Sequence, residues 1–73
     1  MNNLAHVTQR EVQVLQLVAH EYTTKEIAST LYISNHTVIS HRKNLMEKLG
    51  VKNVAGLVRR AFETHLLQLE SQL

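Results

Sequence analysis

Residues 31–50, LYISNHTVISHRKNLMEKLG, combine a helical spacing of apolar residues with side chains that form directional hydrogen bonds. Each helical residue turns by about 100°, which places Leu45 and Leu49 within about 20° of Val38 on one stripe. The opposite side carries a second set of side chains, here named the outer face: His36, Ile39, Ser40, Lys43 and Glu47. The part of it before Glu47 offers an imidazole, an aliphatic group, a hydroxyl and an ammonium, none of which the core requires.

These groups have the chemistry to contact the edges of DNA bases. Lys43 can donate to O6 or N7 of guanine, Ser40 can bond a base or a phosphate, and Ile39 can touch a thymine methyl. His36, one turn nearer the N-terminus, can reach a base edge or a phosphate. The plainer explanations are a solvated lysine at 43 and a chance apolar residue at 39. We predict base contacts by Ile39, Ser40, Lys43 and His36.

The residues that flank the outer face are expected to have more ordinary roles. His41 lies about 60° from the apolar stripe, so a half-buried packing histidine is favoured over a DNA contact. Arg42 flanks the stripe on its other side and could pair with a glutamate or reach a phosphate. Lys48 and Lys52 are expected to be solvated, with contact to the DNA backbone as the less favoured alternative.

Four helices are predicted to position these side chains, over residues 8–21, 24–31, 35–49 and 53–67. TQRE from Thr8 and TTKE from Thr23 are capping boxes, in which the N-cap and the third helical residue bond each other's backbone amide. Ser34 and Asn53 are N-cap residues, and Gly50 suits the left-handed residue that ends a helix. The first helix is expected to face the core with Val14, Leu15, Val18, Ala19 and Tyr22.

A short helix, a joint of about three residues and a longer helix form the helix–turn–helix signature, whose second helix enters the major groove of DNA. Amides at the start of the preceding helix, beside Thr24 and Lys25, can hold a phosphate oxygen because the helix dipole favours negative charge there. The predicted fold is therefore all-α, with one helix–turn–helix domain over residues 1–73.

Composition narrows the classes of partner and compartment. A chain of 73 residues can form one small domain of marginal stability. Eight Lys and Arg residues against six Glu give a net charge of +2, which permits a polyanionic partner without requiring one. The sequence has no cysteine, no apolar run of about 20 residues and no secretory signal profile, so we expect a cytoplasmic protein that does not enter the membrane.

Catalysis and metal binding have little support. The sequence lacks Asp and Cys and has no glycine-rich phosphate loop. His20 has no second histidine at the zinc spacing, and His36 and His41 lie about 140° apart on a helix, so they cannot share a metal ion. We expect no enzymatic activity and no cofactor. The competing function is a protein-interaction module in which Ile39 anchors an apolar contact, because a fold does not fix a function.

Four segments, TQREVQVLQLVA, TTKEIASTLYIS, TVISHRKNLMEKLGVKN and AGLVRRA, together resemble the DNA-binding domain of LuxR-type (GerE-like) bacterial transcription regulators. The resemblance covers residues 7–62, and the HRKN and KLGVKN details are most similar to response regulators of the NarL/FixJ kind. It implies a four-helix domain that binds double-stranded DNA as a dimer. RNA polymerase and an upstream receiver domain are further partners that it suggests.

Carried over by position, the family's base contacts fall on Ile39, Ser40 and Lys43, the residues that the helical wheel also selects. The predicted backbone contacts are Thr24, Lys25, Ser34, Asn35, Thr37 and Arg42. The sequence departs from the family pattern at three positions: Ile39 stands where Lys is frequent, Glu21 where Gly usually ends the first helix, and Thr24 where Asn is common. Residue 21 must then avoid the left-handed conformation or accept strain.

The fourth predicted helix has its own pattern. Val58, Phe62, Leu66, Leu69 and Leu73 recur every three or four residues, which is typical of a helix that packs on another helix. Val58 and Phe62 could serve the core of the monomer, whereas a small domain has little core left for Leu66 to Leu73. We predict a homodimer interface of Val58, Phe62, Leu66 and Leu69, with an upstream regulatory domain as the alternative partner.

Overall fold

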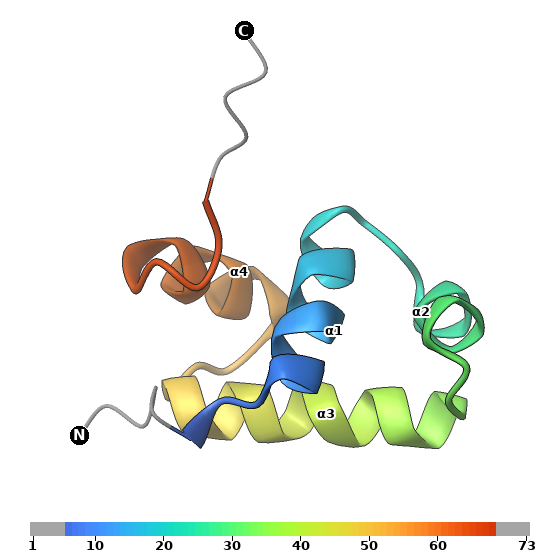
Figure 1. The fold of residues 1–73 in the computed structure, drawn as a ribbon. Helices are drawn as coiled ribbons and strands as arrows, with labels where there is room; N and C mark the ends of the chain where they lie inside the picture. The colour runs from blue at the N-terminus through green and yellow to red at the C-terminus, as the bar shows by residue number, and fades with distance from the viewer. Residues whose placement is uncertain (1–5, 69–73) are drawn as a thin grey trace, which may run out of the picture.

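The computed structural model describes residues 6–68, which form four α-helices joined by short turns (Figure 1). The helices are α1 (Gln9–Ala19), α2 (Thr24–Leu31), α3 (Asn35–Leu49) and α4 (Val54–Glu63). No strand occurs between residues 6 and 68, and the predicted all-α, four-helix fold is confirmed. None of the helices in this range has the length and apolar character needed to cross a bilayer.

Every helix begins with a side-chain cap at the residue that the sequence predicts. The N-cap residues are Thr8, Thr23, Ser34 and Asn53. In the first capping box, Thr8 Oγ1 accepts from the Glu11 amide at 3.1 Å and Glu11 Oε1 accepts from the Thr8 amide at 3.0 Å. The second box, between Thr23 and Glu26, has distances of 3.1 and 2.8 Å. These local bonds satisfy amides that a helix leaves without partners in its first turn.

Each helix is followed, within two residues, by a residue in the left-handed region. These residues are Glu21 (φ 66°), Tyr32 (φ 59°), Gly50 (φ 68°) and His65 (φ 65°). The joint after α1 therefore contains a left-handed glutamate, the strained alternative for residue 21. Such a conformation brings Cβ close to the neighbouring carbonyl oxygen in any residue but glycine.

The left-handed residues also explain where α1 and α4 end. α1 ends at Ala19, two residues before the predicted limit, and Tyr22 follows the turn with 42% of its surface exposed instead of lying in the core. α4 ends at Glu63 instead of residue 67, because the chain turns at His65. The amides of Leu66 and Leu67 then bond the carbonyl of Ala61 at 2.9 and 3.1 Å, which folds Leu67 back onto the core.

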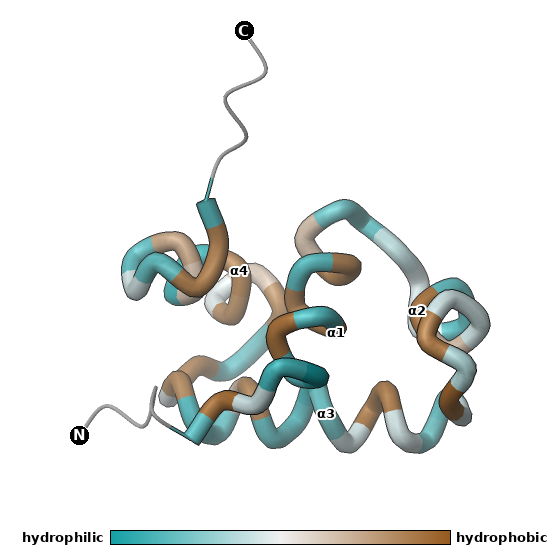
Figure 2. Tube along the Cα trace, viewed as in Figure 1, coloured by the Kyte–Doolittle hydropathy of each residue, from teal (hydrophilic) through white to brown (hydrophobic). Residues whose placement is uncertain are grey.

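The core consists of two clusters that meet along α1 and α3. Val14 and Leu15, adjacent in α1 and both 0% exposed, belong to different clusters. The α1–α3–α4 cluster contains Leu15, Leu45, Leu49, Leu57, Ala61 and Leu67. The α1–α2–α3 cluster contains Val14, Ile27, Ala28 and Val38. α2 and α4 lie on opposite sides of α1, and hydrophilic and apolar segments alternate along α3, as expected for a helix buried on one side (Figures 1 and 2).

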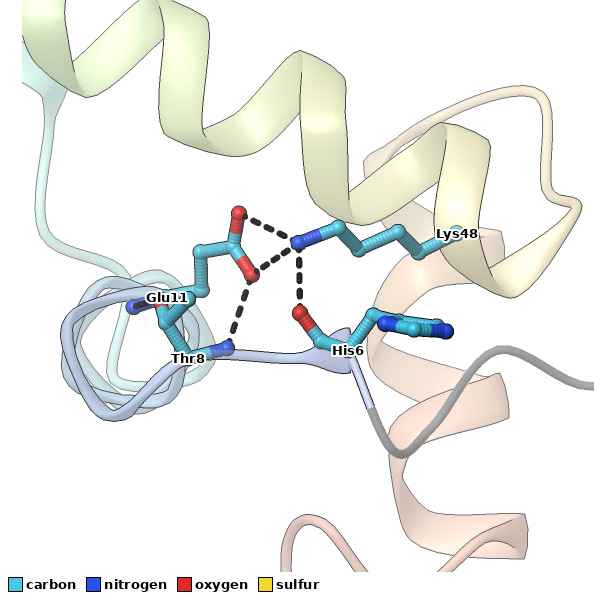
Figure 3. A network of polar contacts seen from close by, with 4 residues as sticks. All are labelled: His6, Thr8, Glu11 and Lys48. Carbon is cyan, nitrogen blue, oxygen red and sulfur yellow. Dashed lines mark hydrogen bonds and ion pairs between the residues drawn. The ribbon is translucent and has the colours of Figure 1, made fainter.

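A polar network fixes the start of α1 against the last turn of α3 (Figure 3). Lys48 Nζ lies 2.7 Å from Glu11 Oε1, 3.0 Å from Oε2 and 2.7 Å from the carbonyl oxygen of His6. Glu11 is 3% exposed, and the Lys48 side chain is only 25% exposed. The prediction that Lys48 is solvated is therefore wrong: helix docking places its ammonium beside a buried carboxylate, which a helical wheel does not consider.

Glu11 is buried and still ionises more easily than a free glutamate. Burial alone raises the pKa of its carboxyl, because a low-dielectric surrounding disfavours the charged form. Hydrogen bonds from Lys48 and from the Thr8 amide, together with the positive charges of Lys48 and His41, outweigh burial and hold the pKa below 4.5. The ion pair thus contributes stability above that pH and loses its contribution as the pH falls and Glu11 becomes protonated.

Replacing Lys48 with methionine should destabilise the domain by about 2–3 kcal/mol, because the Glu11 carboxylate would stay buried without its cation. The free energy of unfolding, measured by urea denaturation at pH 7, tests this. Lys52→Met is the matched control, since Lys52 is exposed, and it should change stability by less than about 0.5 kcal/mol. The difference between wild type and Lys48→Met should narrow as the pH falls below 4.5. Equal effects of the two substitutions would contradict the structural role of Lys48.

Glu21→Gly should stabilise the domain by about 1 kcal/mol, because glycine adopts the left-handed conformation at residue 21 without a Cβ clash. Thermal unfolding compares it with Glu21→Ala, which removes the same carboxylate and keeps the Cβ. The alanine variant should gain nothing. A gain in both variants would assign the effect to the loss of charge instead of to the backbone.

Candidate nucleic-acid interface

The third helix is buried on one side and free on the other. Val38 and Leu45 are 0% exposed and Leu49 is 6% exposed, which confirms the predicted apolar stripe. The five residues of the outer face are all exposed: His36, Ile39, Ser40, Lys43 and Glu47. Ile39 has 53% of its surface exposed, although it is a large apolar residue. α3 therefore presents an accessible face at one edge of the molecule (Figure 1).

The dimensions and charge of α3 suit a groove of DNA. Its 15 residues span about 22 Å, and the major groove is about 12 Å wide, enough for one helix. Residues 32–46 contain no Asp or Glu, so the first three turns offer no carboxylate that would repel phosphates. Glu47, on the same face, lies in the last turn. The N-terminal two thirds of α3 are accordingly the part that fits a polyanion.

Hydroxyl groups gather at the start of α3. Ser34 Oγ accepts from the Thr37 amide at 3.0 Å, and the two hydroxyl oxygens lie 2.9 Å apart. One hydroxyl donates to the other, which leaves one of the two protons for an outside acceptor. Ser34 and Asn35 are exposed and Thr37 is half-buried. Three of the predicted backbone contacts are thus brought together at one helix end.

The other three predicted backbone contacts meet where α2 begins. Lys25 is exposed, and Thr24 beside it is half-buried. Arg42 Nη1, from α3, donates to Thr24 Oγ1 at 2.8 Å. The sequence predicts that Arg42 pairs with a glutamate or reaches a phosphate; its hydrogen-bond partner within residues 6–68 is the hydroxyl of a residue 18 positions earlier. No local sequence pattern could indicate this bond, because it depends on how α2 docks on α3.

His41 is half-buried on the flank of α3, as predicted for a packing residue. The positive charge of His41 is one of the causes that lower the pKa of Glu11.

The predicted dimer residues that the structure describes are all half-buried. Val58, Phe62 and Leu66 are half-buried and pack against the α1–α3–α4 cluster, while Leu69 and Leu73 lie outside the described residues. Phe62 and Leu66 also line an open groove, whose lining includes Leu17 of α1 and His20, which follows α1. The α4 side thus has apolar side chains that the monomer covers only in part.

Comparison with known proteins agrees with this geometry. The model of the luxR family of bacterial regulatory proteins matches residues 5–61. Transcriptional regulatory protein UhpA of Escherichia coli (strain K12) is 51% identical over 57 residues, 78% of this chain and 29% of UhpA. Oxygen regulatory protein NreC of Staphylococcus aureus (strain JH9) is 40% identical over 62 residues, 85% of this chain and 29% of NreC. The chain therefore spans less than a third of the length of these curated relatives.

Two solved structures share the fold. The transcription factor GerE superimposes with a TM-score of 0.82 at 35% identity, over 86% of this chain and 94% of GerE. The response regulator ChrA of a heme-sensing two-component system has a TM-score of 0.81 at 30% identity, over 84% of this chain and 30% of ChrA. The chain belongs to the luxR family of bacterial regulatory proteins and has that family's GerE-like helix–turn–helix fold.

Proposed function

We propose that this domain binds double-stranded DNA at specific sequences, with α3 in the major groove. The observation that supports this best is the outer face, whose first three turns are exposed and free of carboxylates and present Lys43, Ser40 and Ile39 side by side. Membership of a family of bacterial regulatory proteins points to the same class of ligand. Regulation of transcription in the cytoplasm is the corresponding role.

In this proposal the contacts divide by chemistry. Base contacts come from the outer face: a lysine donor for guanine, a serine hydroxyl, an isoleucine for a thymine methyl, and His36 one turn earlier. Backbone contacts come from the two helix starts, through Thr24, Lys25, Ser34, Asn35 and Thr37, and from Arg42 in the middle of α3, which bonds Thr24 at the start of α2. Phosphate contacts fix the register of the protein on the duplex, and base contacts select the sequence.

We further propose that two copies bind together through the α4 side. The partly covered side chains of Val58, Phe62 and Leu66 support this arrangement, with Leu69 continuing the same spacing. Two copies would place their third helices in successive major grooves, about one helical turn apart. In a longer protein such as a response regulator, an upstream receiver domain and RNA polymerase are the additional partners that we propose.

Lys43→Ala should weaken binding by about 1–3 kcal/mol and relax the preference at one base pair, because a base-edge donor is lost. Lys25→Ala should weaken binding to all duplexes alike, because a phosphate contact carries no sequence information. The measurement is a fluorescence-anisotropy titration on the best duplex selected from a random pool, on its single-base variants and on a scrambled control.

Two results would contradict these roles. Equal loss on every duplex for Lys43→Ala would remove that residue from base recognition. Affinity that hardly changes between about 50 and 200 mM salt would contradict DNA as the ligand, because release of condensed counterions makes DNA binding steeply salt-dependent. The alternative function, a protein-interaction module anchored by the 53%-exposed Ile39, would then be favoured.

Inserting about five base pairs between the two selected half-sites should reduce affinity to that of a single half-site, because the insertion rotates one half-site by about half a helical turn. The comparison uses three duplexes: the selected site, the lengthened site and an isolated half-site. Unchanged affinity for the lengthened site would contradict joint binding by two copies in a fixed geometry.

A further inference from the structure

We propose that Arg42 is a positioning residue that acts through Thr24: its guanidinium holds the Thr24 hydroxyl so that the hydroxyl proton is directed at a DNA phosphate. This inference rests on the proposed DNA-binding function. It differs from two independent backbone contacts, because it makes Arg42 and Thr24 one unit in which the loss of either member removes the same interaction.

The hydrogen-bonding capacity of the two groups supports this unit. A threonine hydroxyl has one proton and two acceptor lone pairs, whereas a guanidinium can only donate. In the Arg42–Thr24 bond, at 2.8 Å, Thr24 Oγ1 must therefore be the acceptor, and its own proton remains for another partner. Within residues 6–68, the bond to Arg42 is the hydrogen bond that this hydroxyl makes.

Two other threonine hydroxyls of this domain donate their proton to the preceding helical turn, whereas those of Thr8 and Thr23 accept from cap amides. Thr30 donates to the carbonyl of Glu26 at 2.8 Å, and Thr64 donates to the carbonyl of Arg60 at 2.9 Å. Such bonds to the preceding turn are the common use of a hydroxyl in a helix. Thr24 is the first residue of α2 and makes no such bond, so its proton is available to a ligand.

Packing restricts the Arg42–Thr24 pair, and the positive charge of Arg42 strengthens the hydrogen bond between them. Arg42 lies one turn after Val38, the residue of α3 that packs against Ile27 and Ala28 of α2. Both Arg42 and Thr24 are half-buried, so each side chain has fewer accessible rotamers than an exposed one. A cationic donor makes the bond stronger than a neutral one, and it polarises the O–H group that points onwards.

The position of the unit gives it a role in DNA binding. Thr24 is adjacent to the exposed Lys25, and Arg42 is adjacent to Lys43 of the outer face. The bond therefore links the phosphate-contacting end of α2 to the base-contacting helix. It would hold the phosphate contact of α2 at a fixed position relative to the bases that α3 contacts.

A double-mutant cycle tests the inference. Arg42→Met removes the donor and keeps an unbranched apolar side chain, and Thr24→Val removes the hydroxyl and keeps the shape. Each should weaken binding to the selected and the scrambled duplex alike, by about tenfold, as expected for one hydrogen bond to a charged group. The double variant should bind no more than about twofold more weakly than the weaker single variant, because coupled residues are not additive.

Three controls separate the positioning role of Arg42 from a general loss of positive charge and from a loss of folding. Thr24→Ser keeps the hydroxyl and should bind within about twofold of wild type. Arg59→Met removes an exposed arginine from α4, which lies across α1 from α2, and should also bind within about twofold, since distant surface charges are screened by salt. Thermal unfolding of every variant shows that the titrated protein is folded.

The affinity of the double variant distinguishes coupled from independent roles of Arg42 and Thr24. A loss of about a hundredfold in the double variant, the product of the two single losses, would overturn the inference and show that Arg42 contacts DNA by itself. Full affinity of Thr24→Val, or a loss for Arg42→Met confined to one base pair, would also overturn it. Wild-type protein that binds no duplex at low salt would refute the proposed function itself, and the wild-type titration identifies that case.

Discussion

The outer face exists because α3 is held from one side only. α1, α2 and α4 each pack against α3, and the contacts fall on the stripe of Val38, Leu45 and Leu49. Since burial of apolar surface is the main stabilising force in so small a domain, this stripe decides which way α3 faces. The opposite side takes no part in the core. It can therefore carry an isoleucine, a serine and a lysine, the residues that we propose contact DNA bases.

Features that depend on a few neighbouring residues could be predicted from the sequence. The four N-caps, the two capping boxes and the bounds of α2 and α3 follow from side chains within three residues of each helix start, and from Gly50 at one helix end. The exposed and buried sides of α3 follow from periodicity alone. Local hydrogen bonds and a regular turn per residue are sufficient for both kinds of inference.

Features that depend on docking could not be predicted. Lys48 meets Glu11 across 37 residues and Arg42 meets Thr24 across 18, and a helical wheel contains no information on either partner. The predicted ends of α1 and α4 are too late, because Glu21 and His65 adopt the left-handed conformation although neither is a glycine. Both long-range contacts join α3 to the start of another helix. The contacts that fix the position of α3 therefore cannot be predicted from local sequence, whereas the residues that α3 exposes can.

The division of the core into two clusters has a consequence for internal motion. α2 and α4 do not contact each other, so each depends on its own cluster and on the two helices between them. The cluster beneath α2 is the smaller, with two valines, an isoleucine and an alanine, whereas four leucines and an alanine from the helices, together with Leu67, support α4. Local opening costs least where the fewest apolar contacts are lost, so α2 should detach transiently while the remainder stays folded. α2, the helix that we propose contacts a phosphate, is then also the helix that opens most readily. Ligand binding would slow this local opening.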